Sequence, residues 1–167
     1  MGGDVYRGKE KGDYRNFYRK LFYKCLIKRF CKDCSTAIDV GAGSGLFYDV
    51  AKHYLNVVGI DLVPSRPEII RCDFRSWIGT TDLLFNSQFI EHVDQGEFMS
   101  FVRRCCKKVF ITITTRPCES FWNSPDHIRP YTKRTIEVLC VQVGFSVVFS
   151  MNLWPTDSFV VVARKRK

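Results

Sequence analysis

A glycine-rich turn carries the strongest chemical signal in this chain. The segment Asp39-Val-Gly41-Ala-Gly43-Ser-Gly45 follows a short apolar run and precedes residues with helical character. Glycines allow a sharp backbone turn and let a ligand approach the backbone closely. The first turn of the helix that follows presents free N–H groups and positive potential. The segment therefore predicts a binding site for a carboxylate, a ribose or a phosphate.

Acidic side chains lie at the ends of the next two predicted strands. Asp61 can accept hydrogen bonds from two ribose hydroxyls, and Asp73 can accept one from an amine such as adenine N6, with Phe74 packed against the adenine face. Ligands of open parallel sheets bind outside the carboxyl ends of the strands, where all these groups fall. Either aspartate alone is explained by turn capping. Together with the glycine turn, they predict a nucleoside-containing cofactor.

The elements that would position these residues alternate between strand and helix. A basic, aromatic-rich amphipathic helix is expected over residues 14–32. Strands are then expected at 36–40, 57–61, 68–72, 82–86, 108–114, 145–152 and 158–163, and helices at 45–54, 95–105 and 132–143. The alternation predicts an α/β fold with a mainly parallel sheet and helices on both faces. The last two strands have no helix between them and should pair antiparallel.

Several of these motifs, in this order, resemble the class I S-adenosylmethionine-dependent methyltransferases, particularly the type 11-like group. The resemblance covers about residues 35–164 and is carried by segments 37–45, 58–61, 82–93, 124–132 and 143–145. It implies a Rossmann-like seven-stranded sheet with a reversed last strand, and S-adenosylmethionine as the cofactor. The cofactor-binding residues that it implies are Asp39, Gly41, Ala42, Gly43, Gly45, Asp61, Leu62, Asp73, Phe74, Asn86, Ser87 and Gln88.

The resemblance also implies a role for each group in methyl transfer. Asp39 and the backbone of residues 41–45 would hold the methionine end, and residues 86–88 would lie beside the sulfonium. Transfer from a sulfonium needs positioning and electrostatics, with no metal or covalent nucleophile. His92 and His127 are the candidate bases for an acceptor that carries a proton. For His92, a structural histidine at a helix start is the alternative.

The chain departs from the family pattern in two places. Only eleven residues, with two prolines, separate Asp61 from Asp73, so the helix usual there should be lost or reduced to a turn. No inserted lid domain is present, and the helix over 14–32 is the candidate to cover the site. The expected organisation is an N-terminal helical segment over 1–34, a methyltransferase domain over 35–164 and a basic tail over 165–167.

The methyl acceptor is left open by the sequence. Residues 86–89 read Asn-Ser-Gln-Phe and lack the Asn/Asp-Pro-Pro-Tyr run of amino-methylating nucleic-acid enzymes. A small metabolite, a lipid-like quinone precursor, a protein side chain and RNA all stay open. The alternatives to an enzyme of this class are a cofactor-binding but non-catalytic module and a nicotinamide oxidoreductase. The latter needs a third glycine where this chain has Leu46.

The positive charge of the chain is concentrated at its two ends. The 167 residues carry a formal net charge of +9, and residues 1–33 hold ten Lys/Arg against four Asp/Glu, while the last four residues are all basic. Such basic ends predict contact with a polyanion such as RNA or DNA, and the affinity of this contact would fall as the salt concentration rises. The alternative is that the basic ends serve only solubility. We expect no membrane helix, because no apolar run is long enough, and a cytoplasmic location, because the start lacks an apolar signal segment.

Eight cysteines are many for a chain without an export signal. Cys31 and Cys34 have the spacing of half a zinc site, but the other close pair, Cys105 and Cys106, is adjacent. We therefore predict no metal site, and we expect most of the thiols to behave as small buried apolar groups.

Overall fold

The sheet of this protein has seven strands in the order β3-β2-β1-β4-β5-β7-β6. The computed structural model describes residues 5–166. The strands are β1 (Thr36–Val40), β2 (Asn56–Asp61), β3 (Ile69–Arg71), β4 (Thr81–Ser87), β5 (Cys106–Thr115), β6 (Phe145–Leu153) and β7 (Ser158–Lys165). Pairing is parallel from β3 to β5, and β7 runs antiparallel to both of its neighbours. The predicted seven-stranded sheet with a reversed last strand is confirmed, as is the terminal hairpin.

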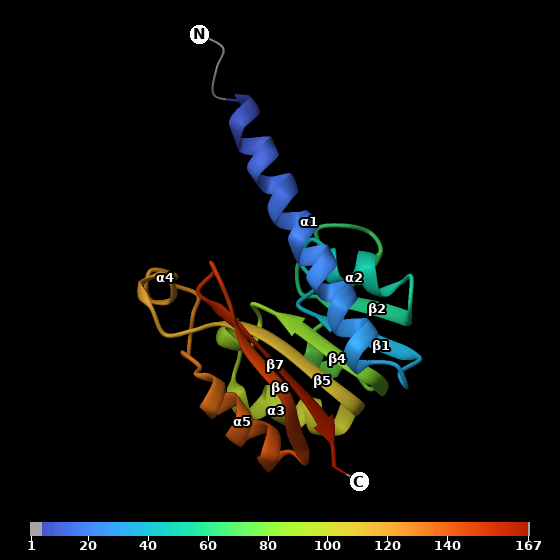
Figure 1. Cartoon of the computed structure of the whole chain (residues 1–167). Coiled ribbons are helices and arrows are strands. Elements are labelled where there is room, and N and C mark those ends of the chain that lie inside the picture. The colour runs from blue at the N-terminus through green and yellow to red at the C-terminus, as the bar shows by residue number, and fades with distance from the viewer. Residues whose placement is uncertain (1–4, 167) are drawn as a thin grey trace.

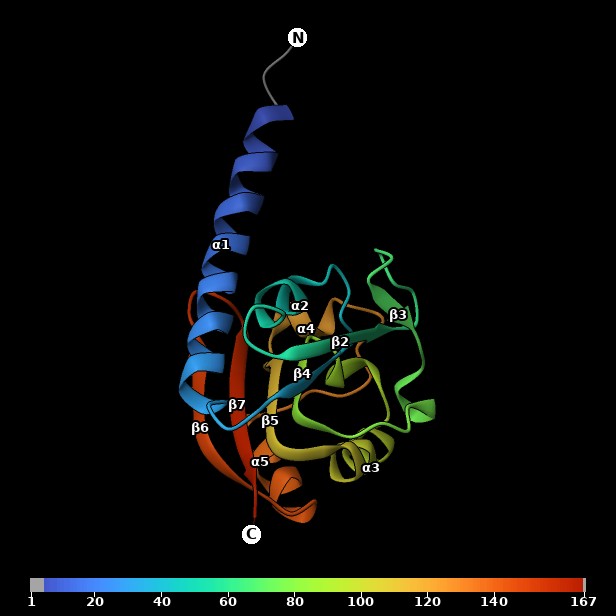
Figure 2. The same cartoon turned by 90° about the vertical axis from the view of Figure 1, so that its right-hand side faces the viewer.

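Helices cover both faces of the sheet, as predicted (Figures 1 and 2). One face carries α1 (Val5–Phe30) and α2 (Leu46–Ala51), and the other carries α3 (Gln95–Cys105) and α5 (Lys133–Gln142). Three short helices lie in connections: η1 (Phe74–Ser76), η2 (Ile90–His92) and α4 (Glu119–Trp122). Side chains of a strand alternate between faces, so each face has its own buried cluster. Neighbouring Leu83 and Leu84 show this, because each belongs to a different cluster.

The C-terminal half of α1 is anchored by aromatic packing. Tyr23 is buried and lies edge-on to Phe47 of α2 and Phe85 of β4, at ring-centroid distances of 5.7 and 5.2 Å. Phe47 and Phe85 stack at 3.7 Å. The amphipathic pattern of residues 14–32 predicts a helix with one face packed against a core, and the C-terminal half of α1 is packed in this way. The helix begins at Val5 rather than at residue 14, and its N-terminal half projects away from the sheet (Figure 2).

The connection between β2 and β3 contains no helix, as the two prolines and the short spacing predicted. The helix after the glycine turn is shorter than expected and ends at Ala51. At the C-terminus, β7 runs to Lys165, one residue beyond the expected end of the domain, and the Arg166 N–H donates to the Gly144 carbonyl. Within the described part of the chain, none of the helices combines the length and the apolar character that crossing a bilayer requires.

Candidate cofactor site

The glycine turn connects β1 to α2 in a tightly fixed conformation. Gly41, Gly43 and Gly45 have φ values of 67°, 50° and 73°, a region that glycine adopts without steric cost. The N–H groups of Gly41 and Ala42 both donate to the Ile60 carbonyl of β2, at 3.0 and 3.1 Å. The turn is thereby tied to the ends of two adjacent strands, and α2 begins directly after Gly45.

Asp61 faces this turn from the end of β2. Its Oδ2 accepts the Gly43 N–H and its Oδ1 accepts the Val63 N–H, both at 2.9 Å. The Ser65 hydroxyl donates to the Gly43 carbonyl at 2.6 Å, so Gly43 is hydrogen-bonded through both its N–H and its carbonyl group. A carboxylate offers about four acceptor positions, so each oxygen keeps capacity for a further donor. Asp61 therefore suits the pair of ribose hydroxyls that the sequence assigned to it, and its neighbour Leu62 is exposed.

Asp39 is a buried carboxyl group directly before the turn. It is 3 % exposed, and it accepts the Tyr48 backbone N–H, while its Oδ2 has no partner within residues 5–166. Burial raises the pKa of Asp39 to about 7, and the nearby charge of Asp61 adds to the effect. A buried acceptor without a donor is costly. An ammonium group of a ligand would supply that donor, so this residue fits the methionine end of the expected cofactor.

Asp73 and Phe74 lie close to the same edge but have partners within the protein. Asp73 accepts the Arg75 backbone N–H at 2.9 Å and pairs with the Arg75 guanidinium, which holds the pKa of Asp73 below its usual value. It caps η1, the turn-capping alternative noted above. Phe74 is 7 % exposed and packs edge-on against Phe98 and Phe101 of α3. Their contacts with adenine stay a prediction.

The polar residues that end β4 make bonds across the sheet. Asn86 is fully buried, and its Oδ1 accepts the Thr112 hydroxyl of β5 at 2.9 Å. Gln88 has a positive φ of 54° and accepts the Thr115 hydroxyl at 2.5 Å. Its Nε2 donates to Ser158 of β7 at 3.1 Å. The side chains of Asn86 and Gln88 thus connect the carboxyl ends of β4 and β5 with the start of the antiparallel β7, and the half-buried Ser87 lies between them.

Comparison with solved structures identifies the fold. A methyltransferase from Archaeoglobus fulgidus, described as dependent on S-adenosylmethionine, matches with a TM-score of 0.74 at 16% identity, over 96% of this chain and 100% of that one. The magnesium protoporphyrin IX methyltransferase of Synechocystis PCC 6803, with bound S-adenosylhomocysteine, matches with a TM-score of 0.71 at 12% identity, over 99% and 90%. The fold is that of the class I S-adenosylmethionine-dependent methyltransferases.

A third structure with this methyltransferase fold comes from a two-protein complex. It holds the Haloferax volcanii Trm112 methyltransferase activator and a candidate methyltransferase, and it matches with a TM-score of 0.72 at 12% identity, over 96% of this chain and 95% of that one. No protein-family model and no curated protein matches the chain by sequence.

Two residues that contact the glycine turn were not predicted from the sequence. The ring of Phe89 packs on Gly41, so that an ideal Cβ at Gly41 would lie 2.2 Å from Phe89 Cδ2. Arg66 lies 3.0 Å from the corresponding position at Gly45 and bonds to Asp49 at 2.9 Å. Phe89 lies within the 82–93 segment that carries the resemblance, but its contact with Gly41 arises from the tertiary structure and has no signal in the sequence. Arg66 lies in the helix-free connection, where the sequence carries no signal for it.

Substitution of Gly41 by alanine should destabilise the fold more than the same change at Gly144. Both residues have positive φ, which costs an L-residue about 1–2 kcal/mol, but a Cβ at Gly144 would meet nothing within 4 Å. At Gly41 the collision with Phe89 adds about 1–3 kcal/mol. Urea unfolding of Gly41→Ala and Gly144→Ala measures the difference. Equal losses of unfolding free energy would contradict this prediction, because they would show that the Phe89 ring moves aside without cost.

The two candidate bases of the predicted methyl transfer, His92 and His127, lie side by side. Their ring centroids are 4.7 Å apart, and one potential metal-ligand atom of each lies within 4.8 Å of a Glu91 carboxylate oxygen. No feature of the sequence indicates that Glu91 lies with them. By contrast, Cys31 and Cys34 have no third metal-ligating side chain beside them among the residues that the structure describes.

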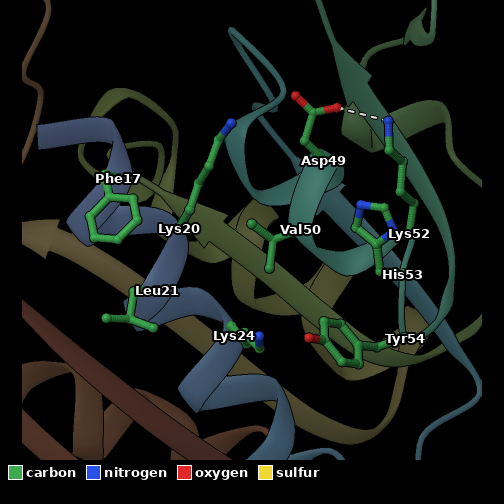
Figure 3. A pocket seen from close by; sticks show the side chains of 9 residues that line it. All are labelled: Phe17, Lys20, Leu21, Lys24, Asp49, Val50, Lys52, His53 and Tyr54. Atoms are coloured by element: carbon green, nitrogen blue, oxygen red, sulfur yellow. Dashed lines mark hydrogen bonds and ion pairs between the residues drawn. The ribbon is translucent and has the colours of Figure 1, made fainter. Parts of the chain in front are cut away.

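A basic groove runs between α1 and α2 (Figure 3). It has a volume of about 530 Å³. Its lining residues are Phe17, Lys20, Leu21, Lys24, Asp49, Val50, Lys52, His53 and Tyr54. Lys52 is paired with Asp49 at 3.0 Å, whereas Lys20 and Lys24 extend from α1 on the other wall. The groove is open to solvent and presents aromatic and cationic side chains together.

Proposed function

We propose that this chain binds S-adenosylmethionine at the β1–α2 turn and transfers its methyl group to an acceptor. The observation that supports this most directly is the pair of carboxyl groups at the turn. Asp61 holds the Gly43 N–H and keeps acceptor capacity, and Asp39 Oδ2 is a buried acceptor without a donor in the described structure. A methyltransferase of the same fold has been crystallised with S-adenosylhomocysteine.

Each residue at the turn has a distinct task in this proposal. Asp61 binds the two ribose hydroxyls, Asp39 takes the ammonium of the methionine end, and Asp73 receives the adenine amine beside its bond to Arg75. The bound cofactor would supply an electrophilic methyl carbon on a sulfonium: the lone pair of the acceptor forms a bond to this carbon in line with the S–CH₃ bond, which breaks and releases S-adenosylhomocysteine. The protein contributes position, because holding donor and acceptor in line removes much of the entropic cost of the reaction.

A macromolecular or polyanionic acceptor stays part of this proposal. The exposed half of α1 presents Tyr14, Phe17 and Tyr18, each more than 60 % exposed, next to Lys20 and Lys24 of the basic groove. Aromatic and cationic side chains in one surface are the combination that binds single-stranded nucleic acids. RNA and DNA are therefore the polyanions that we propose for this surface.

Product formation tests the proposed activity. Incubation of the protein with S-adenosylmethionine and fractionated cell extract should release S-adenosylhomocysteine in amounts above an extract-only control. Asp61→Ala should release none. If the protein binds the cofactor but no fraction supports turnover, the alternative of a non-catalytic subunit is favoured.

A further inference from the structure

We propose that Glu91, His92 and His127 bind a divalent transition-metal ion. Glu91 and His92 belong to η2, directly after β4, and His127 lies in the connection that precedes α5. One potential ligand atom from each side chain lies within 4.8 Å of those of the other two. Tetrahedral ligands at ordinary zinc distances are about 3.4 Å apart, so small side-chain movements would complete the coordination.

Glu91 supplies the observation that points to a cation. The residue is fully buried, and its Oε1 accepts the Thr115 N–H at 3.3 Å. Its Oε2 has no hydrogen-bond partner within the described residues. A buried carboxylate is costly unless it is paired or bound to a metal. A cation placed between Glu91 and the two imidazoles would provide the missing partner.

Both imidazoles are held in the tautomer that leaves a ligand nitrogen free. His92 Nδ1 lies 3.0 Å from the Asp126 carbonyl oxygen, and His127 Nδ1 lies 2.9 Å from the Phe121 carbonyl oxygen. A carbonyl oxygen only accepts, so Nδ1 is the donor in each of these bonds and Nε2 is the ring nitrogen that is left to bind a metal. Metal-binding histidines are oriented by the same kind of bond from the second ring nitrogen.

The backbone fixes the three ligands relative to one another although His127 is distant in sequence. The N–H groups of Ile128 and Arg129 both donate to the Glu91 carbonyl, at 2.8 and 3.4 Å. This attaches the connection that carries His127 to η2. The ring of His127 also stacks on Phe121, with a centroid distance of 4.5 Å. The ligands are therefore presented by packed and bonded segments rather than by free side chains.

Two imidazoles and one carboxylate favour ions such as Zn²⁺, Co²⁺ or Fe²⁺ over Ca²⁺ and Mg²⁺, which prefer oxygen ligands alone. Three protein ligands leave at least one open position, as in catalytic metal sites. The cluster begins two residues after Phe89, whose ring packs on Gly41 of the proposed cofactor turn. If the proposed function holds, the open position would take an oxygen or nitrogen of the acceptor and lower its pKa.

Titration of the metal-free full chain with Co²⁺ tests the site without any cofactor. We expect visible d–d absorption that saturates at one ion per chain, without the near-ultraviolet bands of thiolate ligation. Glu91→Gln, His92→Asn and His127→Asn should each weaken binding by about 100-fold or more, since each removes a direct ligand. Asparagine retains a donor for the carbonyl that Nδ1 faces, and glutamine retains an acceptor for Thr115, so these variants preserve the local bonds.

Matched controls separate this site from other ligands in the chain. His53→Asn removes the remaining histidine, which lies in the basic groove, and a Cys31→Ser, Cys34→Ser variant removes the thiol pair. Both should bind Co²⁺ as the unaltered chain does. The proposal would be overturned if only the thiol variant lost Co²⁺ binding, or if the unaltered chain showed no saturable absorption. Neither outcome depends on whether the ligand variants fold. Binding of S-adenosylmethionine is measured separately in metal-free buffer, so either proposal can fail alone.

Discussion

Replacement of Asp61 by alanine is expected to abolish measurable binding of S-adenosylmethionine while the sheet stays folded. The carboxylate holds the N–H groups of Gly43 and Val63, and it is the acceptor proposed for two ribose hydroxyls. Hydrogen bonds to charged groups contribute about 1.5–3 kcal/mol each, so the loss of two to the ligand weakens binding by about 100-fold or more. Loosening of the turn adds to this loss. Titration calorimetry measures the affinity, and circular dichroism reports on the fold.

Glu68→Ala is the matched control for this experiment. Glu68 is a carboxylate in the connection that follows Asp61, but it accepts a hydrogen bond from the Arg66 guanidinium, at 3.0 Å, and its side chain is about half exposed. Its removal should leave the affinity for S-adenosylmethionine nearly unchanged. Asp61→Asn retains an acceptor oxygen without the charge and should give an intermediate affinity. An Asp61→Ala protein that binds as tightly as the unaltered chain would refute the assignment of the ribose site.

The features that the sequence predicted correctly depend on local chemistry and on the order of elements. A glycine turn between a strand and a helix is a local property, and parallel strands bring their carboxyl ends to one edge. These two facts were enough to place Asp61 beside Gly43. The missing helix between β2 and β3 followed from the short spacing and the two prolines in that connection. The antiparallel pairing of β6 with β7 followed from the absence of a crossover helix between them, whereas the reversed last strand was implied by the family resemblance.

The features that could not be predicted depend on contacts between distant segments. Phe89 covers Gly41 because the end of β4 meets the end of β1, and no spacing in the sequence encodes that contact. Asn86 has the residue type of a ligand group, yet its side-chain oxygen bonds to Thr112 of the neighbouring strand. Glu91 joins His127 only because the connection before α5 is bonded to η2. The type of a residue indicates which groups its side chain could bind, whereas contacts with distant segments decide whether the side chain is available to bind them.

The stability of the protein should carry a pH dependence that originates at Asp39. Its pKa is about 7 in the folded protein because of burial, against an ordinary value of 3.8. Between these two values the folded state binds a proton that the unfolded state has lost. The free energy of unfolding therefore falls as pH rises from about 4 to about 7, by about 1.4 kcal/mol for each pH unit, and this penalty is constant at higher pH. The total is on the order of 4 kcal/mol.

Asp39→Asn isolates this contribution, because asparagine has the same shape and does not ionise. The difference in unfolding free energy between the variant and the unaltered chain, measured in urea from about pH 4.5 to about pH 8.5, should shift steadily in favour of the variant until about pH 7 and then level. Other titrating groups cancel in this difference. A difference that does not change with pH would mean that Asp39 is ionised throughout. Saturating S-adenosylmethionine should reduce the slope in the unaltered chain, because an ammonium paired with the carboxylate lowers its pKa and removes the penalty that burial imposes.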